Sequence, residues 1–315
     1  MSCILIGTAS WTDKSLIDSG GFYPPAVKSP EERLKFYASE FPIVEVDSSY
    51  YALPSPQNAR LWAERTPERF TFNVKAFRLF TGHQTDPKVL PKDIREALGP
   101  VEAKYLYYRD VPEELRDELW HRFREALEPL RATGKLGAVH FQFPPWFTYR
   151  SDSFHHIKEC IAKLQGGTGE AWAKAEQGYL MATELRHASW FEGKHLDGTL
   201  RFERERRLVH VVVDSPQGPR NSVPAVWEVT EPDLVIVRLH GRNQETWNMK
   251  GLTSSADRFN YDYSDAELAD IAEKIHTLSR NVARVHVLFN NNNGDQAQRN
   301  AKTFTTIIRR WQHTG

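Results

Sequence analysis

Two pairs of charged and titratable residues end two apolar, β-branched segments of the chain. Glu184 and Arg186 alternate in TELRH, and Arg238 and His240 repeat this spacing in VRLHG. Residues two apart on a strand lie on the same face, roughly 6–7 Å apart at Cα. The arginines are therefore predicted to hold a phosphate or carboxylate, while His240 and Glu184 transfer protons. Asp214, which ends the segment VVVD, is predicted to orient His240.

The same side chains allow two other interpretations. Glu184 and Arg186 could form a purely structural ion pair. Glu184, Asp214 and His240 are also acceptable ligands for a divalent metal, and barrel enzymes such as sugar isomerases and abasic-site endonucleases distribute their ligands in this way, an analogy of fold only. Because arginines beside the acids favour charge pairing, no cofactor is predicted, and a divalent metal is kept as the alternative.

Further candidate ligand-binding residues stand late in other apolar segments or in the loops after them. They are Asp47, Lys75, Ser10, Trp11, Gln142, Trp190, Asn290 and Asn291. Lys75 adds a cation, unless it serves as the partner of Asp47 or Glu45. The tryptophans could stack on a ligand or fill the bases of loops. The run FNNNNGD is predicted to end a strand, with one or two amides aimed into a site and the others shaping the turn that follows.

Elements that alternate along the chain must position these residues. Strands are expected at 3–11, 43–51, 70–77, 136–143, 180–187, 208–214, 233–241 and 284–291, and helices at 30–41, 55–65, 113–131, 153–164, 195–206, 264–280 and 296–311. Strand–helix alternation with eight strands predicts one α/β domain over 1–315, a closed (β/α)8 barrel. Residues 215–232 contain no convincing helix, and the long insertions 78–112 and 242–263, after the third and seventh strands, are candidate lids.

The alternation of polar and apolar residues within each strand supports the barrel. One face of every strand is almost wholly apolar, as contact with surrounding helices requires. The other carries polar groups, namely Thr8 and Ser10, Glu45 and Asp47, Asn73 and Lys75, His140 and Gln142, Glu184 and Arg186, His210 and Asp214, Arg238 and His240, and His286 and Asn290. These are predicted to point into the barrel, with Glu45, His140, His210 and His286 sharing one buried tier.

Composition limits the class of protein. Among 315 residues the formal net charge is zero, which argues against a general nucleic-acid binder with a strongly basic surface. The two cysteines, Cys3 and Cys160, match no disulfide framework. The start MSCILIGTASW has no basic region ahead of an apolar run, and no apolar run approaches the length of a membrane span. The expectation is a soluble, cytoplasmic protein without membrane association.

The motifs together resemble those of the YecE-like proteins, known as domain of unknown function 72. The matching stretches run almost end to end: IGTASW, GGFYPP, VEVDSSYYALPS, FTFNVKAF, LGAVHFQFPPWF, TELRHASWF, VVVDSP, VRLHGRN, RFNYDYSDAEL and FNNNNGDQAQRNA. The resemblance implies a TIM barrel and no particular activity. It places the family's characteristic polar residues at Glu45, Glu184, Arg186, Asp214, Arg238, His240, Asn290 and Asn291. Many members carry asparagine where this chain has Asp47, which adds a negative charge.

The sequence is compatible with three functions. The first is an enzyme that acts by acid–base chemistry on a small anionic or hydroxyl-rich ligand at the carboxyl ends of the strands, where polar residues of such barrels usually carry the chemistry. The second is a metal-dependent hydrolase or isomerase. The third is a non-catalytic protein that binds a nucleotide or single-stranded nucleic acid. A small anion or a nucleotide is the expected partner, and nucleic acid is less favoured.

Overall fold

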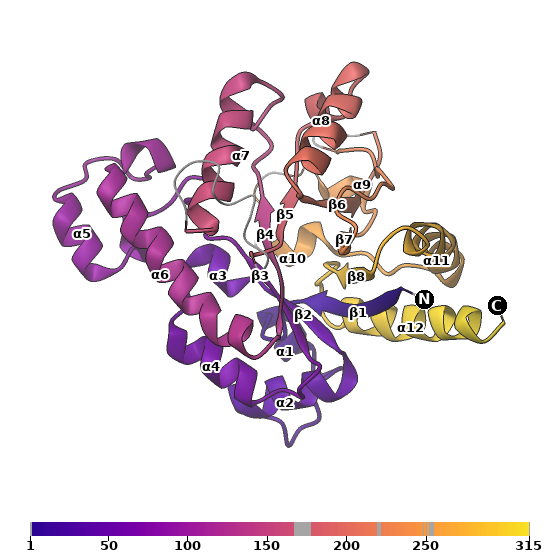
Figure 1. Ribbon diagram of the computed structural model, residues 1–315. Helices are drawn as coiled ribbons and strands as arrows, with labels where there is room; N and C mark the ends of the chain where they lie inside the picture. The colour runs from indigo at the N-terminus through magenta and orange to yellow at the C-terminus, as the bar shows by residue number, and fades with distance from the viewer. Residues whose placement is uncertain are drawn as a thin grey trace.

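Eight parallel strands close into a barrel, with helices on its outside (Figure 1). The computed structural model describes residues 2–166, 178–218, 222–247, 249, 251 and 255–314. Each strand pairs with its neighbours in sequence, and β1 pairs with β8, so the predicted (β/α)8 barrel is confirmed. The strands are β1 (Cys3–Ala9), β2 (Ile43–Val46), β3 (Thr71–Lys75), β4 (Leu136–Gln142), β5 (Met181–Glu184), β6 (Val209–Asp214), β7 (Leu234–Leu239) and β8 (Arg284–Phe289).

The outer layer contains the predicted helices and several short ones. Those predicted are α2 (Pro30–Glu40), α4 (Pro56–Glu64), α6 (Glu113–Ala132), α7 (Ser151–Leu164), α8 (Lys194–Glu205), α11 (Asp265–Ser279) and α12 (Gln296–Thr314). The helix starts follow their capping signals, because Ser29 and Ser264 each form a capping box with the glutamate three residues later. The helix α12 packs against β1, so both termini lie on the same side of the molecule (Figure 1). No helix within the described ranges is both long and apolar enough to cross a bilayer.

Short helices occupy the connections around the mouth of the barrel. They are α1 (Lys14–Ser19), α3 (Ser48–Tyr51), η1 (Pro87–Val89), α5 (Lys92–Leu98), η2 (Tyr108–Asp110), η4 (Ala188–Trp190), α9 (Gln244–Trp247) and α10 (Ser255–Arg258). The prediction of a strand to residue 51 is wrong: β2 ends at Val46 and the chain continues as the short helix α3, where the Ser49 hydroxyl lies within hydrogen-bond distance of the carbonyls of Val46 and Lys75. Between β6 and β7, the described residues 215–218 and 222–233 contain no helix, as expected. The two expected insertions are present, and residues 248, 250 and 252–254 of the second lie outside the described residues.

The strand register shows which side chains point into the barrel. Glu45 aligns with Asn73, Lys75 with His140, and Gln142 with Glu184. Residues that align across parallel neighbours face the same side. The polar face predicted to be internal is therefore internal on β2, β3, β4, β5, β7 and β8.

The prediction is wrong for β1, where the apolar face is internal. Leu5 aligns with the inward His286, and Gly7 aligns with Ile43. A Cβ atom at Gly7 would lie 2.0 Å from the carbonyl oxygen of Ile43, so β1 contributes small groups where it meets β2. Thr8 points outward instead, and its hydroxyl lies 3.0 Å from the Tyr37 hydroxyl of α2.

The prediction is also wrong for β6, where Val211 and Val213 point inward. Val213 aligns with the inward Arg238. His210 points outward, and its Nδ1 lies 2.9 Å from Glu203 Oε2 on α8. The expected tier of Glu45, His140, His210 and His286 therefore lacks His210, because Glu203 outside the barrel satisfies its ring.

This outward pair predicts a pH-dependent contribution to stability. His210 is buried, which acts to lower its pKa, but Glu203 outweighs burial and raises the pKa above its usual value. The pair therefore stabilises the fold below the unfolded-state pKa of about 6.5, and this contribution is lost as pH rises through the higher folded-state pKa. Glu203→Gln is expected to lower the free energy of unfolding by about 1.5–3 kcal/mol at pH 6 and by less at pH 9. Denaturant titration at both pH values measures this. The exposed neighbour variant Glu205→Gln should change little, and equal losses for Glu203→Gln at both pH values would contradict the prediction.

Candidate functional site

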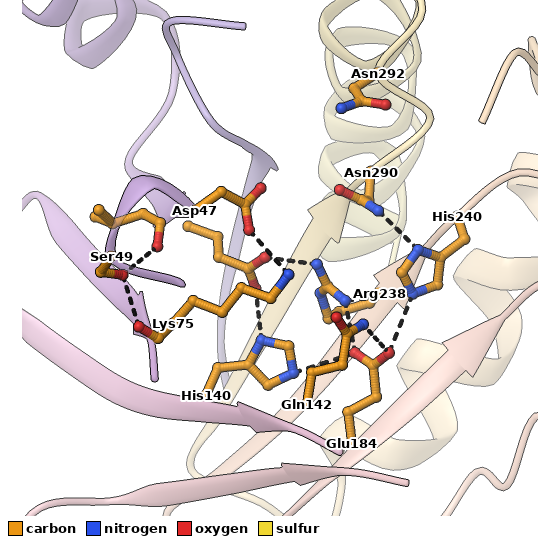
Figure 2. A network of polar contacts seen from close by, with 12 residues as sticks. Asp47, Ser49, Lys75, His140, Gln142, Glu184, Arg238, His240, Asn290 and Asn292 are labelled. Atoms are coloured by element: carbon orange, nitrogen blue, oxygen red, sulfur yellow. Dashed lines mark hydrogen bonds and ion pairs between the residues drawn. The ribbon is translucent and has the colours of Figure 1, made fainter. Parts of the chain in front are cut away.

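Arg238 is the centre of a buried charged cluster inside the barrel (Figure 2). Its Nη1 donates to Glu184 Oε2 and its Nη2 to Glu45 Oε1, both at 2.6 Å. The two glutamates come from β5 and β2, so the guanidinium spans the interior from β7. Because a buried charge is costly unless paired, these three side chains form one unit.

His140 joins the same two glutamates from β4. Its Nδ1 lies 3.1 Å from Glu45 Oε2, and its Nε2 lies 3.1 Å from Glu184 Oε2. Burial acts to raise the pKa of both glutamates, but Arg238, assisted by His140, outweighs it and holds each pKa below its usual range. Glu45 and Glu184 are therefore ionised at neutral pH.

Glu184 also contacts polar groups nearer the mouth. Its Oε1 accepts hydrogen bonds from Gln142 at 2.6 Å and from Arg186 at 3.3 Å. The ion pair between Glu184 and Arg186 therefore exists, although Arg238 is the closer partner. With its oxygens shared among these donors, Glu184 is fully engaged as an acceptor.

His240 stands above Glu184 at the carboxyl end of β7. Asn290 Nδ2 donates to His240 Nδ1 at 2.8 Å, and His240 Nε2 lies 3.5 Å from Glu184 Oε1 (Figure 2). Burial lowers the pKa of His240 to about 4, against the opposing effect of Glu184. The ring is therefore a neutral imidazole at neutral pH, fixed on both sides by hydrogen-bonding groups.

A cavity of about 260 Å³ lies at the carboxyl ends of the strands, above this cluster. Six of the residues predicted from the sequence line it: Asp47, Lys75, Gln142, Arg186, His240 and Asn290. The other lining residues are Tyr50, Tyr51, His83, Phe143, Pro145, Arg258, Phe259 and Asn292. Three cationic side chains, from Lys75, Arg186 and Arg258, thus face one carboxylate, from Asp47. Such a balance favours an anionic ligand.

Asp47 and Lys75 form an ion pair on the cavity wall. Their Oδ1 and Nζ atoms are 3.2 Å apart, so the pairing considered for Lys75 is present. Burial raises the pKa of Asp47, and the nearby Glu45 adds to this effect, while Lys75 opposes it. The pKa of Lys75 is also raised, because Asp47 outweighs burial. The pKa of Asp47 therefore lies above the ordinary value of an aspartate.

Two predicted stacking residues are core residues instead. Trp11 is buried, and its ring lies 5.8 Å from that of Trp62 in an edge-to-face arrangement. Trp190 is fully buried, and its Nε1 donates to the carbonyl of Phe147 at 2.6 Å. Both tryptophans fill the bases of loops and do not line the cavity.

Ser10 and Asn291 shape the backbone around the mouth. Ser10 adopts a left-handed conformation, with φ of 65°, that ends β1, and its hydroxyl accepts from the Thr12 amide. Asn291 is buried, and its amide donates to the carbonyl of Tyr261. Neither side chain lines the cavity, which agrees with a turn-shaping role for part of the asparagine run.

Asp214 does not orient His240 through its side chain, which corrects the prediction. Its carboxylate points outward and accepts hydrogen bonds from Arg242 Nη2 at 2.8 Å and from the Tyr263 hydroxyl at 2.7 Å. The same hydroxyl accepts the amide of Gly241, so Asp214 supports the loop after β7. The residues of the metal-binding alternative are not brought together either, because Asp214 faces away from Glu184 and His240. Within the described ranges, no group of three His, Cys, Asp or Glu side chains is placed to hold a metal.

The sequence interpretation did not select the other eight lining residues, several of which come from α3 and the long connections. Tyr50 lies in α3, His83 in the connection after β3, and Arg258 and Phe259 in the connection after β7. The unusual length of both connections, which marks them as candidate lids, is the sequence feature that points to these residues. Individual residues within irregular segments could not be chosen, because such segments have no periodicity that assigns a direction to each side chain.

Comparisons with known proteins agree on one family. The model of the family described as "Protein of unknown function DUF72" matches residues 5–314. The chain is 34% identical over 309 residues to the UPF0759 protein YunF of Bacillus subtilis, covering 97% of this chain and 94% of that protein. A DUF72 family crystal structure from Enterococcus faecalis has a TM-score of 0.75 at 27% identity, covering 97% of this chain and 95% of that one. One from Thermotoga maritima has a TM-score of 0.73 at 26% identity, covering 98% and 99%.

Proposed function

Since the chain belongs to the DUF72 family, whose description carries no activity, we propose from the site itself that it is an enzyme acting by acid–base chemistry on a small anionic, hydroxyl-bearing ligand. The phosphate or carboxylate of that ligand would bind in the cavity at the mouth of the barrel. The observation that carries the proposal is the excess of cationic side chains in a small cavity directly above a buried, ionised cluster. Polar residues at this end of a TIM barrel usually carry the chemistry.

Arg186 is the proposed main anion ligand. Its guanidinium forms an ion pair with Glu184 at 3.3 Å and lies over the ring of Trp247 at 5.6 Å. These two contacts fix the position of the guanidinium. Lys75 and Arg258 supply further positive charge on the cavity wall. A preorganised arginine loses little side-chain entropy when it binds a carboxylate or phosphate.

Asp47 and His240 are the proposed proton-transfer groups. Asp47 has a raised pKa and lines the cavity, and His240 is neutral at neutral pH and lines it as well. Glu184, the acid first expected to transfer protons, is instead proposed to position Arg186 and Gln142, because its pKa is held too low for it to accept a proton near pH 7.

The first experiment is native mass spectrometry and elemental analysis of protein purified without chelator, followed by calorimetric titration with inorganic phosphate, sugar phosphates, sugar acids and nucleoside monophosphates. Saturable binding of a small anion, followed by its conversion in a product screen, supports the proposal. Binding without conversion of any bound compound would support a binding protein instead. Stoichiometric metal would redirect the screen to hydrolases and isomerases whose ligands differ from the set first predicted.

Arg186→Gln is expected to weaken the affinity for inorganic phosphate by roughly 10- to 100-fold, because a charge-assisted hydrogen bond contributes about 1.5–3 kcal/mol. The fold should persist, since Arg238 still compensates Glu184 at 2.6 Å. Isothermal titration at low salt measures the change. Arg131→Gln, which removes an exposed arginine paired with Glu128, is the matched control. Equal phosphate affinity in both variants would remove Arg186 from the site.

A further inference from the structure

A second hollow lies beside the mouth cavity. This groove has a volume of about 560 Å³ and runs between residues 82–84 and 107–109 on one side and the start of α7 on the other. Its walls include Gln84, Tyr107, Arg109, Trp146 and Arg150. Its volume falls within the range of sites that bind small molecules. The side chains of this groove have no role in the site proposed at the mouth of the barrel.

Trp146 is exposed on the groove wall. It is 56% exposed, which is unusual for so large an apolar side chain. Two prolines precede it, and the Phe147 amide donates to the Pro144 carbonyl at 2.9 Å in a tight turn. The ring of Phe147 stacks on that of Phe143 at 4.5 Å and anchors the turn to the barrel. The turn therefore anchors the backbone at Trp146 and leaves its ring accessible for a planar ring to stack on it.

Two arginines of the groove lack strong partners. Arg150 makes no ion pair or side-chain hydrogen bond within the part of the chain that the structure describes. Arg109 approaches its neighbour Asp110 at 3.8 Å and lies over the ring of Tyr107 at 5.9 Å. Other surface arginines are held closely, such as Arg131, whose two nitrogens donate to Glu128 at 2.8 and 2.9 Å. Among the described residues, Asp152 is the one acid on the groove wall, so the free charge there is positive.

His83 and Trp146 form the partition between groove and cavity. His83 lines the cavity while Gly82 and Gln84 line the groove, and the His83 and Trp146 rings are 5.8 Å apart, edge to face. Burial, together with nearby Arg78, lowers the pKa of His83 to about 3, so the partition is uncharged. A ligand that crosses it would meet two aromatic rings and then the two guanidinium groups of the groove.

We propose that the groove is a second subsite, which binds a planar ring of the ligand against Trp146 and beside the guanidinium groups of Arg109 and Arg150. The inference rests on the proposed function, because it extends the ligand of the mouth cavity. It narrows the substrate class to anionic compounds that carry a planar ring, of the size of a nucleoside phosphate. Stacking on one aromatic ring and contact with weakly paired arginines are sufficient recognition for such a ring.

The test compares three probes by isothermal titration: inorganic phosphate, ribose 5-phosphate and adenosine 5′-phosphate. In the unaltered protein, adenosine 5′-phosphate should bind roughly 10- to 100-fold more tightly than ribose 5-phosphate, the usual gain from stacking one base. Trp146→Ala should abolish this difference and leave the affinity for phosphate unchanged. Arg150→Gln should weaken only adenosine 5′-phosphate. The controls are Tyr105→Ala, an exposed aromatic that does not line the groove, and Arg201→Gln, an exposed arginine on α8.

The outcomes separate this inference from the proposed function. If Arg186→Gln weakens the affinity for inorganic phosphate, but adenosine 5′-phosphate binds no more tightly than ribose 5-phosphate, the groove subsite is overturned and the mouth site stands. An adenosine preference that survives Trp146→Ala, or no binding of adenosine 5′-phosphate at all, also overturns the subsite. Affinity for oligoadenylate that rises steeply with strand length would overturn it as well, in favour of nucleic-acid binding. If phosphate binding is insensitive to Arg186→Gln while Trp146→Ala still abolishes the adenosine preference, the assignment of Arg186 to the mouth site is overturned and the groove subsite stands.

Discussion

Replacing Arg238 by methionine is expected to lower the free energy of unfolding at pH 7 by about 3–5 kcal/mol, because it leaves two buried glutamates without their main counter-charge. Glu45 and Glu184 each lose a 2.6 Å ion pair, and both are fully buried. Methionine has a similar length, so loss of packing contributes little. Denaturant unfolding followed by circular dichroism measures the change. The variant Arg122→Met, which removes a partly exposed arginine paired with Asp93, should cost less than about 1 kcal/mol.

The pH dependence of this effect identifies its cause. In the unaltered protein Arg238 holds the pKa of Glu184 low. The ion pair of Arg238 with Glu184 therefore stabilises the fold above the unfolded-state pKa of a glutamate, about 4.3. This stabilisation is lost as pH falls through the folded-state pKa of Glu184. Without Arg238, burial raises the pKa of both glutamates, so the variant should recover stability relative to the unaltered protein as pH falls from 7 towards 4.5. The triple variant Glu45→Gln, Glu184→Gln and Arg238→Met should also recover part of the loss at pH 7. If the decrease in the free energy of unfolding caused by Arg238→Met does not vary with pH, a packing defect is indicated and the electrostatic explanation is contradicted.

Asp47→Asn is expected to strengthen the binding of inorganic phosphate by roughly 30- to 1,000-fold at pH 7.5 and low salt. A unit charge about 5 Å from a ligand, at an effective dielectric constant of about 20, is worth about 3 kcal/mol. Among the described residues, Asp47 is the one acid on the wall of the cavity and opposes an anion there, whereas asparagine keeps the shape without the charge. Isothermal titration measures the affinity, and Asp270→Asn, an exposed acid on α11, is the matched control.

The two proteins should also differ in how phosphate binding depends on pH. Asp47 has a raised pKa, so in the unaltered protein phosphate affinity should increase as pH falls through that pKa and the carboxylate is neutralised. The asparagine side chain of the variant cannot titrate, so this increase should disappear there. If the reaction uses Asp47 for proton transfer, its rate should fall by roughly 10²- to 10⁴-fold in the same variant although binding improves. Unchanged affinity and unchanged pH dependence would place the ligand away from Asp47.

The sequence predicted the fold because the barrel depends on local signals repeated eight times. Alternating apolar residues indicated strands, and caps such as Ser29 and Ser264 marked where helices begin. The polar face turned out to be internal on six strands, where Glu45, Glu184 and Arg238 could satisfy one another across the barrel. On those strands the pattern was sufficient to identify many of the residues that line the cavity.

The alternation of polar and apolar residues shows that the two faces of a strand differ, but it does not determine which face points into the barrel. On β6, His210 and Asp214 form the polar face, yet Glu203 and Arg242 satisfy them outside the barrel, and valines fill the interior. The outcome depends on partners from distant segments, which spacing within a strand cannot reveal.

The sequence by itself therefore determined the barrel, its strands and the identity of its polar residues, because these follow from periodicity and capping along the chain. The tertiary structure alone decided their roles. Glu184 is an ionised anchor because Arg238 lies 2.6 Å away, and Asp214 supports a loop because Tyr263 and Arg242 reach it. A carboxylate becomes an acid, a base or a structural partner according to its burial and the charges around it, and those are properties of the folded chain.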